Sequence, residues 1–312
     1  MNLTHAHLLL NHFPTVGMVV GLALFILALI SKSDDIKRAS LALFVVIALL
    51  ALPTFATGTA AQLALSATKG VSQTMIAIHL AAAFLALCFL ELAGALSWIG
   101  LWQYRRHGRI SSSILIGVLI VGLISFGLMS RAASIGGEIR HPEIATGPPP
   151  VEQEEPPPSF AQSAGAILAG YQWAWAASET LHFVGLCLIF GVTLIVDLRM
   201  LGLMRAIPFA TIHRLLPWGM LGFALNVSTG MLFFIGAPPS FYVTNSVYFW
   251  KLAFVMVAGL NTLYFTVVDE PYSVEAGADA PLGAKIAAAS GIALWTAVIF
   301  CGQMLPFLGR SY

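Results

Sequence analysis

The chain has 312 residues, of which 58% are hydrophobic and only 9% are charged, and its mean hydropathy is +0.87. Soluble globular proteins are about one quarter charged, so this composition excludes a soluble globule and indicates a polytopic membrane protein. A net charge of +1 without a strongly basic segment gives no indication of nucleic-acid binding.

Apolar stretches of about 20 residues recur along the chain without the alternation of a membrane β-strand. A backbone in lipid must satisfy its own hydrogen bonds, so these stretches predict membrane-spanning helices and an all-α fold. The first stretch follows no basic segment and is too long for a signal peptide, so we expect it to be retained. Eight spans are expected, at residues 9–30, 39–60, 73–99, 112–133, 176–198, 212–235, 246–268 and 283–307.

A segment rich in proline and glutamate, residues 148–158, separates the fourth span from the fifth. Such a composition cannot pack into a core and predicts an extended acidic linker. We therefore expect two four-helix bundles in series, at residues 1–145 and 161–312, joined by a linker at 146–160. The second bundle begins with an amphipathic segment, residues 160–175, whose aromatic residues favour a membrane surface.

Basic residues concentrate in three of the predicted loops, and such loops usually face the cytoplasm. The N-terminus, the linker and the C-terminus should then face outward. The loop at residues 269–279 is acidic and also predicted inside, but acidic residues count little in this rule. The basic residues are Lys32, Lys37, Arg38, Arg105, Arg106, Arg109, Arg199, Arg205 and Arg214.

Two histidines of the first bundle are expected at a similar depth. His12 lies near the outer end of the first span, and His79 lies about six residues, or roughly 9 Å, inside the outer end of the third. Histidines inside a membrane are costly and usually functional. Neutral imidazoles on facing helices of a bundle can ligate a haem iron from both sides. The sequence therefore predicts haem b held by His12 and His79, and it lacks the Cys-x-x-Cys-His motif of covalent c-type haem.

A haem also needs cations for its propionates and a narrow apolar slot. Arg131 and Arg140, at the outer end of the fourth span, are suited to meet propionates by charge-assisted hydrogen bonds. Five alanines surround His79 and would let a flat ring approach the backbone, although alanine also simply packs helices closely. These alanines are Ala77, Ala81, Ala82, Ala83 and Ala86.

Short motifs of the first bundle carry a resemblance to a known family. They are His12-Phe13-Pro14, Thr57-Gly58, His79 and the Gly-Gly-Glu-Ile-Arg-His sequence at residues 136–141. Through them, residues 8–145 resemble the bacterial membrane domain of unknown function 2231. This resemblance implies a four-helix module of a bacterial inner membrane that binds haem or acts in respiratory electron transfer. The family expects an ending like Tyr-Arg-His-Gly, whereas this chain reads Ile-Arg-His-Pro, so His141 is either an outer ligand or a remnant.

In the second bundle, Glu179 and His182 stand three residues apart on one helical face. The carboxylate is suited to fix the tautomer of a metal-ligating His182, to bind a proton, or to hydrogen-bond a quinone head group. No histidine of the seventh span matches His79. His182 therefore takes a methionine such as Met256 or Met304 as a second iron ligand, reaches a cofactor shared with the first bundle, or binds no metal.

A second resemblance covers residues 176–312 and rests on five motifs. It is to the membrane family of unknown function 6644, and it implies little about chemistry. The motifs are Glu179-Thr180-Leu181-His182-Phe183, Asp197-Leu198-Arg199, Leu216-Pro217-Trp218, Phe249-Trp250-Lys251-Leu252 and Gly259-Leu260-Asn261. Asp197 and Arg199 are expected to form a local ion pair.

Three functions are compatible with these patterns. The first is a cytochrome-b-like carrier that exchanges electrons with quinol or quinone, or with a periplasmic cytochrome or other respiratory subunits. If this carrier belongs to an enzyme, the chain is a subunit of a quinol-linked oxidoreductase. The second is a permease for a metal ion or small solute, with His12, His79, Glu91 and His182 along its route. The third is a cofactor-free anchor subunit of a larger complex.

Overall fold

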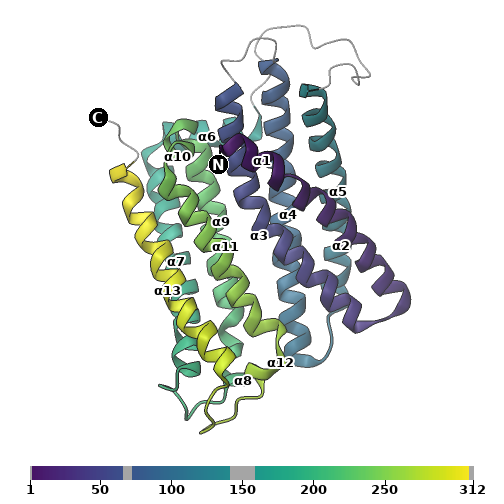
Figure 1. The fold of residues 1–312 in the computed structure, drawn as a ribbon, viewed down its shortest axis with the longest axis vertical. Helices are drawn as coiled ribbons and strands as arrows, with labels where there is room; N and C mark the ends of the chain where they lie inside the picture. Colours follow the sequence, from purple (N-terminus) through teal and green to yellow (C-terminus); the bar gives the residue numbers. More distant parts are fainter. Residues whose placement is uncertain (1, 66–71, 141–158, 309–312) are drawn as a thin grey trace. The chain divides into compact units, whose positions relative to one another are not determined.

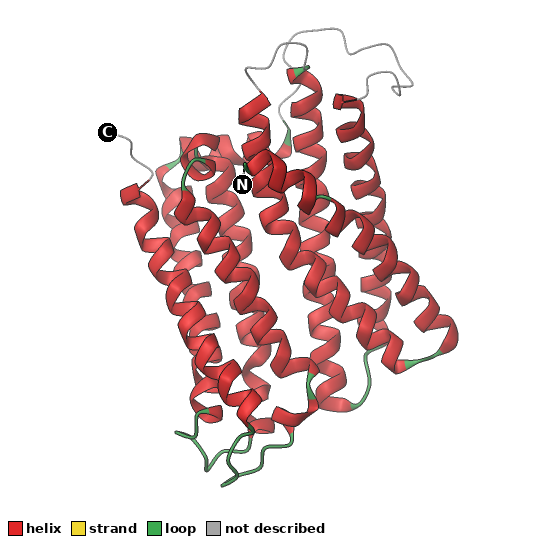
Figure 2. Ribbon diagram, in the orientation of Figure 1, coloured by secondary structure: helices red, strands yellow, loops and turns green. Residues whose placement is uncertain are grey.

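The computed structural model describes residues 2–65, 72–140 and 159–308 of the chain. Every regular element of these residues is a helix, and none is a strand (Figure 2). Eight helices are long and apolar enough to cross a membrane, which confirms the prediction of an all-α polytopic membrane protein. They cover all eight predicted stretches, and the first begins at Leu3, six residues before the prediction. The predicted linker at 146–160 and His141 lie largely or wholly outside the described residues.

The chain divides into two compact units. The first unit comprises residues 1–97, 111–166 and 235–244, and the second comprises residues 98–110, 167–234 and 245–312. The units follow the two expected bundles, except that residues 98–110 join the second unit and residues 235–244 join the first.

The first unit is built on α2, α3, α5 and the first part of α4, with two short helices, α1 and α10. Helix α3 packs against α1, α2 and α10, and α2 also packs against α5. Glycines let these helices approach: a methyl group at Gly94 of α4 would lie 2.5 Å from Cβ of Ala48 on α3. The bounds are α1 Leu3–Leu10, α2 His12–Ser31, α3 Asp34–Leu65, α4 Gln73–His107, α5 Ser112–Arg140 and α10 Pro239–Val243.

The first span is a pair of helices because of a proline. Pro14 has no N–H to donate to the carbonyl of Leu10, and its ring crowds that carbonyl. Helix α1 accordingly ends at Leu10, and α2 begins at His12 (Figure 1). The Asn2 side chain caps α1 by accepting from the N–H of Thr4 at 3.1 Å.

The second unit is built on α7, α9, α11 and α13. Helix α13 packs against α7 and α11, and α7 meets α9 at two glycines, Gly185 and Gly222. A methyl group at Gly222 would lie 2.6 Å from the carbonyl oxygen of Gly185, so only glycine permits this approach. The bounds are α7 Gln172–Met200, α8 Phe209–Ile212, α9 Leu216–Gly236, α11 Ser246–Val267, α12 Asp269–Tyr272 and α13 Leu282–Leu308. Helix α6, Phe160–Gly170, begins in the first unit and ends in the second.

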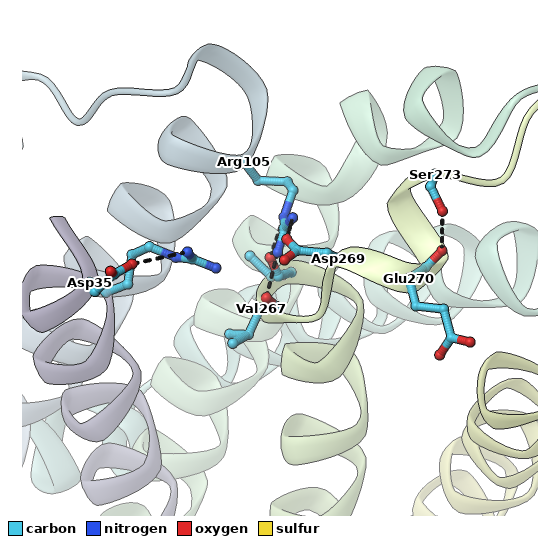
Figure 3. A network of polar contacts seen from close by, with 8 residues as sticks. Asp35, Arg105, Val267, Asp269, Glu270 and Ser273 are labelled. Carbon is cyan, nitrogen blue, oxygen red and sulfur yellow. Dashed lines mark hydrogen bonds and ion pairs between the residues drawn. The ribbon is translucent and has the colours of Figure 1, made fainter.

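One end of the second unit is held together by arginines that bind backbone carbonyls. Arg105 donates to the carbonyl of Thr266 at 2.9 Å, and also to the carbonyl of Val267 and to Asp269 (Figure 3). These carbonyls belong to the last turn of α11, which has no helical donors left for them. A second ion pair at this end joins the Asp279 carboxylate to the Arg205 guanidinium at 3.2 Å. The acidic loop at residues 269–279 thus supplies counter-ions to basic residues of its own unit.

Candidate functional site

His7 of α1 lies against the C-terminal half of α3. Its Nδ1 donates to the carbonyl oxygen of Thr54 at 3.0 Å, and the side chain is half-buried. The ring lies directly over Gly58, where a methyl group would come within 2.9 Å of the imidazole Cε1. A carbonyl oxygen can only accept, so the ring proton is on Nδ1 and Nε2 carries a free lone pair.

His79 of α4 makes the same contact with α5. Its Nδ1 donates to the carbonyl oxygen of Ala132 at 2.9 Å, and a methyl group at Gly136 would lie 2.9 Å from its Cε1. The ring is half-buried, and its Nε2 also carries the lone pair.

The two contacts share one design. In each, the glycine follows the accepting carbonyl by four residues, so it lies one helical turn further along the same face. Each imidazole therefore presents its Cε1 edge to one turn of a neighbouring helix. The two rings are also near enough for the charge of His79 to act on His7. The first unit thus holds two imidazoles of one tautomer, and neither Nε2 has a hydrogen-bond partner among the described residues.

His12, which the sequence paired with His79, lies in a different environment. Its side chain is exposed on α2, and its Nδ1 donates at 3.0 Å to the carbonyl of Leu8, on the preceding turn of the chain. His12 therefore lacks the contact with a neighbouring helix that His7 and His79 each make. The physical reason is that the first span begins at Leu3, which places His7 inside the helical hairpin with α3.

The expected propionate partners are only partly placed. Arg131 is exposed on α5 and directly precedes Ala132, the residue that holds His79. Arg140 is the last residue of α5, but its side chain is outside the described part of the structure, as is the whole of His141. Of the alanines around His79, Ala86 is fully buried, whereas Gly136 is the small residue that meets the His79 ring.

In the second unit, His182 of α7 bonds to α9 by its side chain. Its Nδ1 lies 2.7 Å from Oγ1 of Thr229, and that hydroxyl donates its own proton to the carbonyl of Leu225 at 2.6 Å. The hydroxyl must then accept from His182, which leaves the imidazole Nε2 free. Glu179 is exposed on the same helix, and Lys251 lies within electrostatic range of His182.

One further polar group departs from expectation. Arg199 does not pair with Asp197: its guanidinium donates to backbone carbonyls, those of Glu275 at 2.8 Å and Ala278 at 3.3 Å among them. Residues two apart on a helix face nearly opposite directions, which explains why this ion pair does not form. Glu91 has a buried carboxylate oxygen, Oε1, without a hydrogen-bond partner among the described residues.

Sequence reasoning did not single out His7, but it had singled out both glycines that lie against the rings of His7 and His79. Gly58 belongs to the Thr57-Gly58 motif, and Gly136 opens the motif at residues 136–141. Within residues 2–65, 72–140 and 159–308, no three His, Cys, Asp or Glu side chains gather as metal ligands. Comparisons with family models, with curated proteins and with solved structures find no match for this chain.

Proposed function

We propose that the first unit binds a b-type haem, with His7 and His79 as the two axial ligands, and that the protein transfers electrons within a membrane. The observation that carries this proposal is the duplicated imidazole contact: Nδ1 bound to a helix carbonyl, Cε1 on a glycine and Nε2 free. A six-coordinate haem iron takes two such Nε2 atoms from facing helices.

The residues around both imidazoles fit such a group. The carbonyls of Thr54 and Ala132 orient the rings and raise the basicity of Nε2, as the second partners of metal-ligating histidines commonly do. Gly58 and Gly136 have no side chains, so the imidazole rings occupy space that a side chain at either position would fill. Arg131, next to Ala132, offers a cation for a propionate.

Bound there, the haem would supply a one-electron carrier, while the protein would hold its ligands and exclude water. Electron partners follow from the membrane setting: quinol in the bilayer, or a periplasmic cytochrome or another respiratory subunit. Glu179 and the Nε2 lone pair of His182 provide two acceptors for the hydroxyl groups of a quinol head group. We place the protein in a bacterial inner membrane with both termini outside, since the basic loops favour the cytoplasm.

A pyridine haemochrome assay on the purified, full-length protein tests this proposal. It identifies the haem type and gives the ratio of haem to protein. We expect b-type haem at a fixed ratio, either as purified or after addition of haemin to the folded protein. Protein that is folded but neither contains nor takes up haem would overturn the proposal.

A further inference from the structure

Lys251 places an ammonium group inside the second unit without a counter-ion. It lies on α11, five residues, or about 8 Å, beyond the first residue of that helix, Ser246. Its side chain is half-buried, and its Nζ makes no hydrogen bond or ion pair with the described residues. Unpaired charges are costly within a membrane, and ionisable residues in membrane helices usually mark a functional site. The position of Lys251 therefore indicates a ligand.

An apolar core cluster shows which way Lys251 faces. Val255, one turn after Lys251 on the same face of α11, packs against this cluster. Leu186 of α7 also packs against it, and Leu186 lies one turn after His182. Lys251 and His182 therefore project from the cluster sides of their helices, and they lie within electrostatic range of each other. The cluster consists of Ile189, Ala258, Trp295 and Val298.

Helix α13 borders the same region. It runs antiparallel to α11, since Asn261 in the second half of α11 bonds to Ala287 near the start of α13. Near the other end of α13, a methyl group at Gly302 would lie 3.5 Å from Nζ of Lys251. The neighbouring Cys301 thiol, a weak acceptor, is within electrostatic range of the ammonium. Three helices thus bring an ammonium, an imidazole and a thiol to one region.

His182 supplies this region with an acceptor. Its Nδ1 donates to Oγ1 of Thr229 at 2.7 Å, which leaves the lone pair on Nε2. Its ring packs against Phe233, with 5.5 Å between the ring centroids. The ammonium of Lys251 supplies donors and no acceptor. The region therefore presents one charged donor and one neutral acceptor beside an aromatic ring.

A hydroxyl group on an apolar ring matches this pair. Its proton needs an acceptor, which Nε2 of His182 provides, and its oxygen can accept from Lys251 at the same time. A carboxylate without a proton would leave the imidazole lone pair unmatched, and the ammonium would repel a metal cation. The apolar cluster and Phe233 favour a lipid-soluble molecule as the carrier of this hydroxyl.

We propose that a hydroxyl group of a quinol binds between Lys251 and His182, donating to Nε2 of His182 and accepting from the ammonium of Lys251. This inference rests on the quinol partner of the proposed function and adds Lys251 to the residues that bind it. It also identifies the hydroxyl group as the part of the quinol that these two residues recognise.

Binding of duroquinol, which is tetramethylhydroquinone, to the full-length protein in detergent tests this proposal. A ligand that binds the folded state raises Tm in a saturable way. We expect anaerobic duroquinol to raise Tm and its dimethyl ether to leave Tm unchanged, because the ether keeps the apolar ring but has no hydroxyl proton. The measurement needs no electron transfer, so protein with or without haem is suitable.

Variants at Lys251 locate the bound quinol. Lys251→Met removes the ammonium but keeps a long side chain, so the half-saturating concentration of duroquinol should rise about tenfold or more. The loss of an unpaired charge should also keep this variant folded. Lys251→Arg restores the charge and should recover part of the binding. Lys32→Met, at an exposed lysine of the first unit, is the control and should respond like the wild type.

His182→Phe keeps an aromatic ring beside Phe233 but removes the acceptor, and it should weaken duroquinol binding as well. Equal Tm with duroquinol and with its ether would overturn the proposal, as would an unchanged duroquinol response in Lys251→Met. Haem-free protein that binds duroquinol through Lys251 would support this proposal while the haem proposal fails. Haem-containing protein without a duroquinol response would overturn this proposal and leave the haem proposal standing.

Discussion

His79 donates from Nδ1 to the carbonyl oxygen of Ala132 at 2.9 Å, and its ring lies on the glycine one turn later, Gly136. His7 repeats this arrangement on Thr54 and Gly58. Each glycine is required for the contact, because any side chain there would displace the imidazole. The candidate haem site is therefore defined as much by two residues without side chains as by the two histidines.

The first prediction concerns these glycines. Gly58→Ala and Gly136→Ala should each place a methyl group 2.9 Å from an imidazole carbon, so the ring must move. Crowding of this kind costs about 1–3 kcal/mol in the free energy of unfolding. We expect a lower unfolding temperature and a lower ratio of haem to protein, measured on purified variants.

Gly127 is the matched control, since it lies on α5 with no atom within 4 Å of an added methyl group. Gly127→Ala should keep the wild-type haem ratio and gain up to about 1 kcal/mol from helix propensity. Equal behaviour of all three alanine variants would show that the glycines do not hold the rings.

The second prediction concerns Thr229, whose hydroxyl accepts from His182. Thr229→Val should leave the Nδ1–H of a half-buried imidazole without its partner, at a cost of about 1–3 kcal/mol in the free energy of unfolding. Chemical unfolding in detergent measures this cost. Thr180→Val serves as the comparison, because the exposed Thr180 hydroxyl bonds only its own helix at Ala176. The prediction fails if the two variants are equally stable.

The third prediction concerns Arg105. Arg105→Ala should free the last carbonyls of α11, at Thr266 and Val267, and release Asp269. Hydrogen bonds to a charged group contribute about 1.5–3 kcal/mol each where they are buried, so a clear fall in unfolding temperature is expected. Arg105→Lys should recover only part of it, because an ammonium cannot bind several acceptors in the fixed fork of a guanidinium. Arg109→Ala, at an exposed position, should change little.

The eight spans were predictable because their signal is local: a run of apolar residues long enough for a membrane specifies a helix wherever it packs. The contact of His7 with Thr54 and Gly58 was not predictable. Hydropathy does not reveal that Leu3 starts the first helix, nor that Pro14 divides it, so it did not indicate that His7 lies against α3.

The polar interior of the second unit required tertiary structure. Helical geometry alone argues against a pair between Asp197 and Arg199. It cannot show, however, that Asn261 on another helix points its amide hydrogens toward Ala287 and Ser290. Glycines at the motif positions, Gly58 and Gly136, were visible in the sequence, but their role depends on which ring lies over them.

The fourth prediction concerns acid stability. A hydrogen bond from Lys285, together with the charge of Arg205, lowers the pKa of Asp279 below its usual value of 3.8. The unfolded chain therefore binds a proton at higher pH than the folded one, so Asp279 stabilises the fold at and above pH 4. This contribution is lost as the pH falls below about 4, through the folded pKa.

Asp279→Asn should accordingly lose stability at neutral pH and show a shallower decline on acidification than the wild type. Unfolding temperatures measured at low salt from pH 6 to pH 2.5 would reveal the difference, which should shrink at high salt because Asp279 is exposed. Parallel pH profiles for the two proteins would contradict this assignment.

The most direct test of the haem proposal compares reduced-minus-oxidised spectra of three alanine variants, at His7, His79 and His12. The account predicts that His7→Ala and His79→Ala lose the bands of a low-spin, six-coordinate b haem, while His12→Ala, whose imidazole is exposed, keeps them. Loss of these bands in His12→Ala but not in His7→Ala would contradict the account, as would bands that survive in His79→Ala.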